Sequence, residues 1–394
     1  MTSVENEVGE NVVQDVGWSG RVRQCVRSFI RLLWLSRSEL GVPLAVFLSG
    51  VLLQRLAALF PEFTERFYAR SIYPPLLVAL SWFSRHFRFS VGELLTYLLL
   101  TAAFVCVVRL CVWLYLRPGE RARRIVASAR FGLWFAAVFL WAFLLSFGLN
   151  YQRPLLFNLL EYERRSASAS ELEAMSSEVL RGVNQSYEEA HAGGRPMPER
   201  EGMVGLLRES YDAVPELTLL PRGEYALPKP VLSSEVMSRL GVSGVYSPFT
   251  GEPNYNSDMP DFQLPFTMAH EMAHQRGVAR ESEANFVAYL VCINSRDPFI
   301  RYSGYRNGLG VLGEFYRLDP EKAGALIKQL SPGYREDSRR AAIFWAKAAG
   351  AAGSLSRRVN DLYLRANRVS AGAADYSGST ALIIGYYLKG MVRN

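Results

Sequence analysis

The chain has 394 residues, of which 49% are hydrophobic and 21% charged. This composition excludes a disordered or collagen-like polymer, and its hydrophobic share is above that of an ordinary soluble enzyme. The net charge of +7 belongs entirely to residues 1–150, which hold 16 arginines, no lysine and nine acidic residues. Residues 151–394 hold 28 basic and 28 acidic residues. Because this second half is neutral, we expect no nucleic-acid partner.

Three long apolar stretches in the first half predict membrane spans. Each is long enough to cross the ~30 Å hydrocarbon core of a bilayer as a helix. Arg55 and Arg109 lie nearer one end of a span than its centre, which favours snorkelling to the interface over an ion pathway. The predicted organisation is a polar and basic tail (1–39), a transmembrane region (40–152, with spans at about 40–60, 94–116 and 131–152) and a following domain (153–394).

The arginines predict the orientation of these spans. Five precede the first span and five fill the short loop before the third: Arg21, Arg23, Arg27, Arg31, Arg37, Arg117, Arg121, Arg123, Arg124 and Arg130. By the positive-inside rule both segments are cytoplasmic, although the loop 61–91 carries four arginines against two glutamates. We therefore expect a multi-pass cell-membrane protein with a cytoplasmic N-terminus and with the domain after Asn150 outside the cytoplasm.

Hydrophobic periodicity predicts a mainly helical second half. A capping box at Ser170–Glu173 opens the first helix, and another helix covers Met203–Val214. The segment Gly244–Asn256 is rich in glycine, proline and aromatic residues, which suits either an extended edge strand or a connecting loop. Helices return from about Leu264.

The candidate chemistry lies in the sequence His270-Glu271-Met272-Ala273-His274. Residues four apart share one face of a helix, so two imidazoles can bind one metal ion with Glu271 beside them. An exposed polar helix could match this pattern by chance. The flanking residues are apolar, however, which predicts a buried helix in which two histidines and a glutamate would be costly without a partner. We therefore expect zinc at His270 and His274.

A carboxylate is expected as the third ligand, because the remaining histidines, His86 and His191, lie far away in the sequence. Catalytic zinc sites commonly have three protein ligands. Gly277 suits a left-handed helix cap and a chain reversal, after which a second helix begins near Arg280. That helix offers Glu281 or Glu283.

These two glutamates are about 200° apart around a helix, so only one can face the metal. Glu281 is favoured because it shares a face with Asn285, whose amide could support a ligand imidazole. The other carboxylate would then form a salt bridge or lie at the helix N-terminus. The metzincin spacing would put its third ligand at Arg280, which cannot bind zinc, so the pattern is gluzincin-like.

These motifs resemble those of known families. The Glu-x-x-Ala-Asn of residues 281–285 is similar to the motif of the membrane-anchored CaaX-processing and heat-shock-type endopeptidases and of the phage-immunity antirepressor peptidases. Together with residues 244–254, 264–277, 280–289 and 360–367, it resembles an uncharacterised bacterial family of three-span membrane proteins. The resemblance implies a C-terminal domain of unknown function with a helix-rich, zincin-like α+β metallopeptidase core and a small edge-strand element.

The expected function is zinc-dependent hydrolysis of peptide bonds, with Glu271 as general base. Tyr363 and Tyr246 are candidates for stabilising the oxyanion, although either could be a structural tyrosine. The expected substrate is a peptide or protein associated with the membrane or envelope, and it could add as a strand beside Gly244–Asn256. The alternative is a zinc-stabilised membrane protein that binds or regulates without turnover. A transporter is disfavoured because only three spans are predicted.

Overall fold

The computed structural model describes residues 37–163, 165–194, 196–369, 371–372, 375 and 378–393. Most of the predicted N-terminal tail lies outside these residues. The chain forms two compact units, each described here by itself. The first unit contains the chain up to Leu56 and Leu95–Leu144, and the second contains Ala57–Leu94 and Leu145–Asn394.

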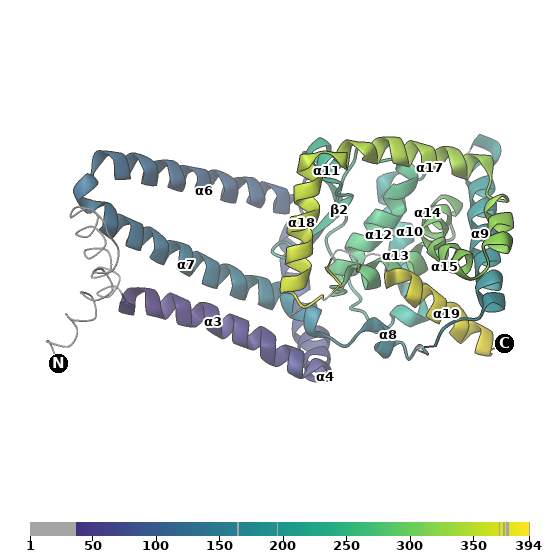
Figure 1. The fold of residues 1–394 in the computed structure, drawn as a ribbon, viewed down its shortest axis with the longest axis horizontal. Helices are drawn as coiled ribbons and strands as arrows, with labels where there is room; N and C mark the ends of the chain where they lie inside the picture. The colour runs from purple at the N-terminus through teal and green to yellow at the C-terminus, as the bar shows by residue number, and fades with distance from the viewer. Residues whose placement is uncertain are drawn as a thin grey trace, which may run out of the picture. The chain divides into compact units, whose positions relative to one another are not determined.

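The structure is mainly helical (Figure 1). The α-helices are α3 (Arg37–Leu59), α4 (Pro61–Phe63), α5 (Tyr73–Ser84), α6 (Val91–Leu116), α7 (Arg121–Ser146), α8 (Leu156–Leu159), α9 (Ala169–His191), α10 (Arg200–Ala213), α11 (Ser234–Leu240), α12 (Leu264–Gln275), α13 (Glu281–Ile293), α14 (Pro298–Gly308), α15 (Gly310–Leu318), α16 (Pro320–Ile327), α17 (Pro332–Trp345), α18 (Ala351–Ala366) and α19 (Ser379–Arg393). The strands are β1 (Lys229–Pro230), β2 (Gly244–Ser247) and β3 (Glu252–Tyr255). The second unit also contains the π-helix η1 (Thr64–Ile72) and the 3-10 helices η3 (Gly148–Gln152) and η7 (Ala346–Ala349).

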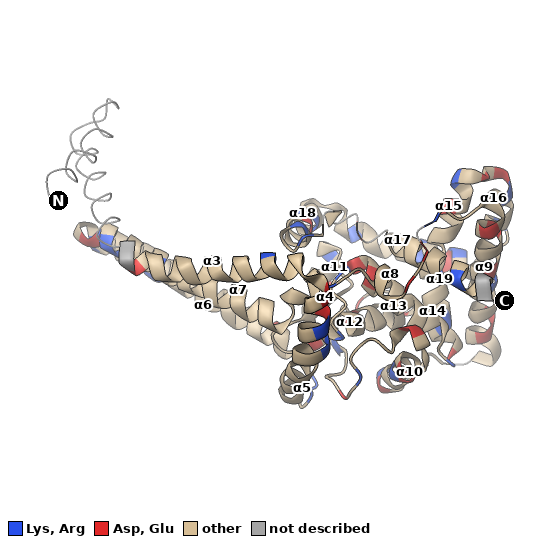
Figure 2. Ribbon diagram, turned by 90° about the horizontal axis from the view of Figure 1, so that it is seen from below, with Lys and Arg blue, Asp and Glu red and all other residues tan. Residues whose placement is uncertain are grey.

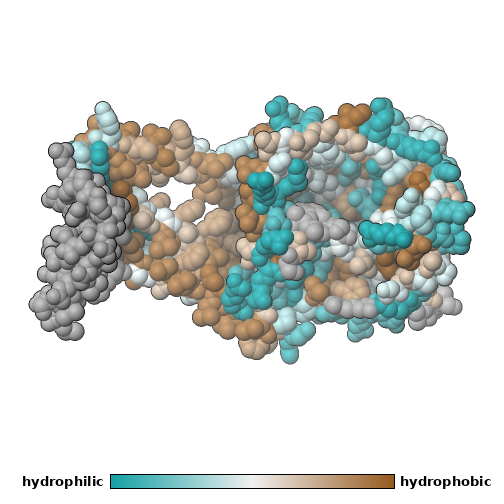
Figure 3. Space-filling view, viewed as in Figure 1, coloured by the Kyte–Doolittle hydropathy of each residue, from teal (hydrophilic) through white to brown (hydrophobic). Residues whose placement is uncertain are grey.

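Three helices are long and apolar enough to cross a membrane. The candidate spans are Glu39–Leu59, Val91–Leu116 and Pro118–Ser146. In Figure 2 most charged residues of these helices lie near their ends, and in Figure 3 the helices carry mainly the hydrophobic colour. Within the first unit, Gly50 lies against Leu140 and Trp141, which lets α3 and α7 approach closely. Trp141 Nε1 donates a hydrogen bond to the Val46 carbonyl at 3.0 Å.

The third span differs from the sequence prediction. Its helix begins at Arg121 and ends at Ser146, whereas we expected 131–152. The chain then forms η3, in which all five residues are buried in the second unit. The apolar run therefore ends inside the core of the second unit, and hydropathy cannot distinguish that core from a bilayer. The helices of the first two spans begin three residues earlier than expected and end within one residue of the expected ends.

Two further predictions need correction. The capping box is formed by Ser168 and Glu171, because α9 begins at Ala169, which places Ser170 inside the first turn. The segment Gly244–Asn256 is a hairpin and not a single strand. Gly251, with φ of +66°, reverses the chain between β2 and β3, a backbone conformation that favours glycine.

The small sheet has the order β1-β3-β2. β3 pairs in parallel with β1 and antiparallel with β2, so β2 is an edge strand. Gly244 lies opposite Tyr255, and Ser247 lies opposite Glu252. α12 packs against both β2 and β3, which fixes the sheet beside this helix.

The core of the second unit surrounds α12 and α13. Nearly every residue of these two helices is buried. Figure 1 shows them at the centre of this unit, where α10, α14 and α19 pack around them and α9 packs on α14 and α19. Burial of so many apolar side chains, at roughly 1.5–3 kcal/mol each, makes this pair of helices the most firmly held part of the unit.

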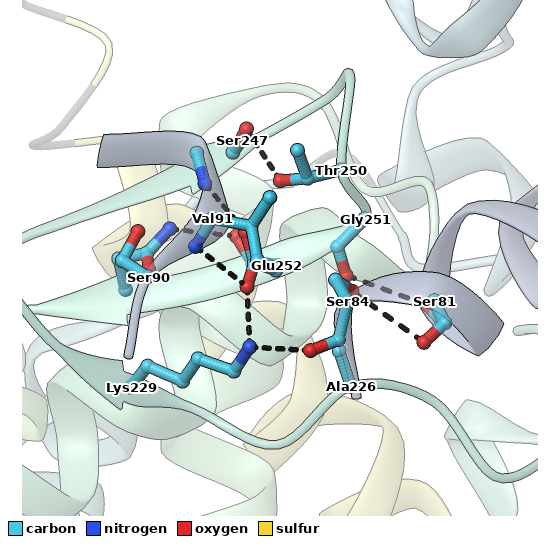
Figure 4. Close-up of polar contacts among 12 residues, drawn as sticks. Ser81, Ser84, Ser90, Val91, Ala226, Lys229, Ser247, Thr250, Gly251 and Glu252 are labelled. Atoms are coloured by element: carbon cyan, nitrogen blue, oxygen red, sulfur yellow. Dashed lines mark hydrogen bonds and ion pairs between the residues drawn. The ribbon is translucent and has the colours of Figure 1, made fainter. Parts of the chain in front are cut away.

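A buried ion pair fixes the start of α6 to the sheet (Figure 4). The carboxylate of Glu252 on β3 accepts hydrogen bonds from the backbone amides of Val91 and Gly92 at 3.2 and 2.7 Å. Lys229 on β1 contacts the same carboxylate and also donates to the Ser84 carbonyl at 2.6 Å. A carboxylate at a helix N-terminus is favourable because it satisfies free amides and the helix dipole. We call Lys229, Glu252 and these two amides the anchor cluster.

The segment between the first two spans is also tied to the core of the second unit. Glu65 of η1 pairs with Arg153 at 2.6 Å, and Arg153 donates to the Gly277 carbonyl at 2.8 Å. Burial raises the pKa of Glu65, but Arg153 and Arg70 outweigh this effect and hold the pKa below its usual value. Tyr73 donates to the Gln275 carbonyl at 2.8 Å. Residues 57–94 therefore support the end of α12.

Candidate metal centre

α12 carries the two histidines of the metal motif. The helix begins after a short 3-10 turn, has Pro265 in its first turn, and buries every residue from Pro265 to Gln275. His270 and His274 are one turn apart, and their ring centroids are 4.6 Å apart. The expected buried helix is thus present, and it presents both imidazoles to the same point.

The turn after α12 brings a carboxylate to the histidines. Gly277 has φ of +82°, and the Val278 amide donates to the Ala273 carbonyl at 3.1 Å, as expected for a left-handed cap. α13 then begins at Glu281. Its Oε2 lies 3.1 Å from His270 Nε2 and 3.5 Å from His274 Nε2.

The three donor atoms form a compact triangle, since His270 Nε2 and His274 Nε2 are 3.0 Å apart. Ligands bound at ~2.0–2.1 Å in tetrahedral geometry lie about 3.3 Å from one another, and imidazole nitrogen and carboxylate oxygen are ligands that zinc accepts. His270, His274 and Glu281 therefore fit a zinc ion in both chemistry and spacing. Among the described residues, no other group of three such side chains meets this test.

A backbone carbonyl fixes the tautomer of His274. Its Nδ1 lies 2.7 Å from the Val278 carbonyl oxygen, which can only accept, so Nδ1 carries the proton. The Nε2 of the neutral ring then has its lone pair directed at the triangle. The sequence suggested the Asn285 amide for such support. In the structure the Val278 carbonyl supports the His274 ring. Asn285 lines the cavity that opens over the three donor atoms.

The charges in the triangle reinforce one another. Burial lowers the pKa of His274, but the negative charge of Glu281 outweighs burial and raises this pKa to about 9. Burial raises the pKa of Glu281, yet the charge of His274 and hydrogen bonds from both rings hold it well below its usual range. The site thus favours an ionised Glu281, which is the form that binds a cation.

Glu283 lies outside this triangle. Its Oε1 accepts a hydrogen bond from the Leu156 amide at 2.7 Å, where the first turn of α8 begins. Burial raises its pKa, and the hydrogen bond from Leu156 partly opposes that shift. This arrangement matches the helix-terminal role that the sequence offered for the carboxylate not facing the metal.

Glu271 is buried beside the triangle and is incompletely satisfied. It is 4% exposed, and its Oε2 has no hydrogen-bond partner. Burial raises its pKa to about 7, although the nearby histidines oppose the shift. A Cβ added at Gly244 of β2 would lie 2.4 Å from Glu271 Oε1. Because Gly244 has no side chain, the Glu271 carboxylate has room beside β2.

The two candidate tyrosines lie around the same cavity. The Tyr246 hydroxyl is 3.2 Å from that of Tyr73, and the Tyr151 hydroxyl donates to that of Tyr363 at 3.2 Å. Burial raises both pKa values, that of Tyr363 to about 12. Both phenols therefore keep their protons at neutral pH. Their partners Tyr73 and Tyr151 flank the span region, and no local motif in the sequence pointed to either.

A cavity of about 1200 Å³ opens over the metal triangle. Its lining contains all three triangle residues and Glu271, together with the edge of β2, one side of α18 and the aromatic residues Phe147 and Tyr151. Phe147 packs edge-on against His274, with ring centroids 6.3 Å apart. The cavity volume is above the roughly 300–1,000 Å³ of typical small-molecule pockets.

Residues 68–384 match a family described as "Protein of unknown function (DUF3810)". The chain belongs to this family. The match includes His270, His274, Glu281, Glu271 and residues 68–94 of the supporting segment, so it covers more than the domain after the third span. No curated protein and no solved structure matches the chain. The function must therefore be inferred from the geometry of the site.

Proposed function

We propose that this protein is a membrane-bound, gluzincin-like zinc metallopeptidase. His270, His274 and Glu281 would hold the metal, and Glu271 would act as general base. The observation that carries the proposal is the convergence of three donor atoms within 3.5 Å beside a buried carboxylate whose Oε2 has no hydrogen-bond partner. Buried polar groups without partners are rare in folded proteins, and they often mark functional sites.

Glu271 supplies the proton transfers in this proposal. Bound zinc supplies a water of lowered pKa, near 7, and polarises the substrate carbonyl. Glu271 takes the proton of the attacking water and passes it to the leaving amine, because a carboxylate with a pKa near the working pH can both accept and donate. Its position under Gly244 fixes the carboxylate at one side of the triangle. Tyr246 and Tyr363 remain candidate donors to the developing oxyanion.

The edge of β2 supports a peptide as substrate. Among the described residues β2 pairs with β3 alone, so its other edge can pair with an extended chain, and Gly244 to Tyr246 line the cavity. Addition of a substrate strand would place its carbonyls beside the metal triangle. The arginine distribution predicts that this domain lies outside the cytoplasm, and membrane or envelope proteins are then the expected substrates. Reporter fusions at residues 20, 125 and 394 test this orientation, and a cytoplasmic residue 394 would overturn it.

Comparison of the wild type with Glu271→Gln tests the enzymatic role. We expect cleavage of membrane or envelope proteins to fall by roughly 10²–10⁴-fold, the usual contribution of a general base, with the metal retained. Glu188→Gln is a matched control, because Glu188 is exposed on α9 and should leave cleavage unchanged. Equal cleavage by the wild type and Glu271→Gln would exclude the enzyme. Bound zinc without any cleavage would instead favour the non-catalytic binding or regulatory protein.

A further inference from the structure

We propose that α18 is an interfacial helix whose exposed apolar stripe, at the rim of the cavity over the triangle, lies in the surface of the bilayer. The stripe consists of Leu355, Val359 and Leu362, which are 63%, 57% and 68% exposed. At about 100° per residue these three side chains lie within roughly 60° of one another, and the fully buried Leu364 points to the opposite side. The helix thus packs on α11 and η7 through one face and exposes an apolar stripe on the other.

The charges of α18 suit a phospholipid surface. Arg357, Arg358, Arg365 and Arg368 stand against a single acidic residue, Asp361, between residues 351 and 368. Arg365 pairs with Asp361 at 2.8 Å, which still leaves a basic excess along the helix. A helix with an exposed apolar stripe flanked by arginines is typical of segments that lie in the plane of a membrane containing anionic lipids.

Hydrogen bonds place the end of α18 close to the point where the chain leaves the third span. Tyr151 donates to Tyr363, and Gln152 Nε2 lies 3.5 Å from the Asn367 carbonyl oxygen. Tyr151 lies five residues beyond Ser146, where the candidate span ends, and at the ~2.0 Å rise of a 3-10 helix this corresponds to about 10 Å. The headgroup layer on each side of a bilayer is about 5–8 Å thick. The C-terminal end of α18 is therefore held close to the outer edge of the headgroup layer.

Exposed aromatic side chains near the ends of the first two spans support a membrane surface on this side of the second unit. Phe63, Trp82 and Phe83 belong to the segment between the first two spans and are 61%, 59% and 55% exposed. Aromatic side chains of this kind gather where the hydrocarbon meets water. The same unit holds the end of α3, the start of α6 and the end of α7, which must emerge on one side of the bilayer.

The location of α18 also indicates the class of substrate, and this step rests on the proposed function. Leu355 and Val359 line the cavity over the metal triangle, so one wall of that cavity belongs to the interfacial helix. A peptide that reaches the site along this wall arrives from the membrane surface. The favoured substrate is therefore a chain anchored in the bilayer and cut just outside it, in preference to a freely soluble peptide.

Spin-label depth measurements on the full-length protein in anionic lipid nanodiscs test the location of α18. Cys25, Cys106 and Cys111 are first replaced by serine, and Cys292 is buried. Single labels are then placed at Leu355, Val359 and Leu362. A label at the lipid-exposed Val107 of α6 gives the membrane reference, and one at the exposed Glu321 of α16 gives the solvent reference.

We expect the ratio of oxygen to nickel-complex accessibility on the stripe to be several-fold above that at position 321 and to approach that at position 107. A ratio equal to that at position 321 would overturn the proposal. Low accessibility to both reagents would also overturn it, because the stripe would then be covered by protein, such as a second copy of this chain. Retained thermal stability of each labelled protein shows that the chain is folded.

Cleavage by Leu362→Ser tests the substrate class separately. Leu362 does not line the cavity. We expect this variant to cut a membrane-tethered peptide several-fold more slowly than the wild type does, with unchanged cleavage of the same peptide free in solution. Equal loss on both peptides, or loss on neither, would refute the substrate class. If the wild type cuts neither peptide, the proposed function fails, whereas the depth measurements still decide where α18 lies.

Discussion

The second unit contains two buried clusters of charge that differ in how completely they are satisfied. In the anchor cluster, Glu252 is fully buried and its carboxylate has three donors, namely two backbone amides and Lys229. In the metal triangle, two imidazole nitrogens and one carboxylate oxygen converge on one point, and Glu271 Oε2 beside them has no partner. The anchor cluster is complete as it stands, whereas the triangle has the composition of a site for a cation.

This difference suggests that the anchor cluster stabilises the fold, whereas the triangle and Glu271 serve the proposed reaction. A satisfied buried ion pair is costly to break because its partner is left charged and desolvated. A buried carboxylate with an unpaired oxygen destabilises the fold, so its removal should cost little stability and much activity. Paired substitutions at the two clusters can test this contrast directly.

The largest effect on stability is expected for Glu252→Gln. The change leaves Lys229 buried without its counter-charge, and breaking such a pair typically costs about 3–5 kcal/mol. In a unit of this size that corresponds to a Tm lower by roughly 6–20 °C. Thermal unfolding in detergent measures it, with Glu271→Gln as the contrasting variant that should keep or raise the Tm. A larger loss of Tm in Glu271→Gln than in Glu252→Gln would reverse the comparison.

Gly244→Ala should reduce activity more than stability. The new methyl group would meet the Glu271 carboxylate at 2.4 Å, so the carboxylate must move away from the triangle. Overpacking of this kind costs about 1–3 kcal/mol, and a displacement of about 1 Å can lower a rate by roughly 10²-fold. The measurement is peptide cleavage alongside Tm.

Gly205→Ala is the matched control for that change, because an added Cβ on α10 meets no atom within 4 Å. It should leave cleavage unchanged and raise helix stability by up to about 1 kcal/mol. Full cleavage activity in Gly244→Ala would show that the close approach of β2 does not position Glu271.

The smallest effect is a pH dependence of stability in the metal-free protein. The raised pKa of His274, about 9, means that the folded state holds a proton that the unfolded state releases near its ordinary value of 6.5. This contribution to stability is complete below about pH 6.5 and is lost as the pH rises through about 9. We expect the Tm of the protein treated with a chelator to fall over this range, and to fall less in His274→Gln. An equal slope in both proteins would contradict the assigned pairing of His274 with Glu281.

The convergence of His270, His274 and Glu281 could be predicted from the sequence because its geometry is local. A helix fixes His270 and His274 on one face, and Gly277 marks the reversal that returns Glu281 to them. The contribution of residues 57–94 could not be predicted in the same way. Glu65, Tyr73 and Val91 meet Arg153, Gln275 and Glu252 across more than 80 residues, and no periodicity or motif encodes such pairings.

The prediction for the end of the third span was wrong for a related reason. Residues 147–152 carry no charge and so continue the uncharged run of the span, but η3 buries residues 148–152 in the second unit, and Phe147 reaches His274. Hydropathy measures only the preference of a side chain to leave water, and a bilayer and a protein core satisfy it equally. For the same reason, the sequence did not indicate that Phe147 and Tyr151 line the cavity.

The metal content of the purified protein tests the central claim most directly. We expect one zinc ion per chain in the wild type and in Glu283→Gln, and a loss of zinc in His270→Ala, His274→Ala and Glu281→Gln. Glu283→Gln is the matched control, because it removes a neighbouring half-buried carboxylate that accepts from the Leu156 amide and lies outside the triangle. A wild-type protein without stoichiometric zinc, or one that keeps its zinc in Glu281→Gln and loses it in Glu283→Gln, would contradict the site described here.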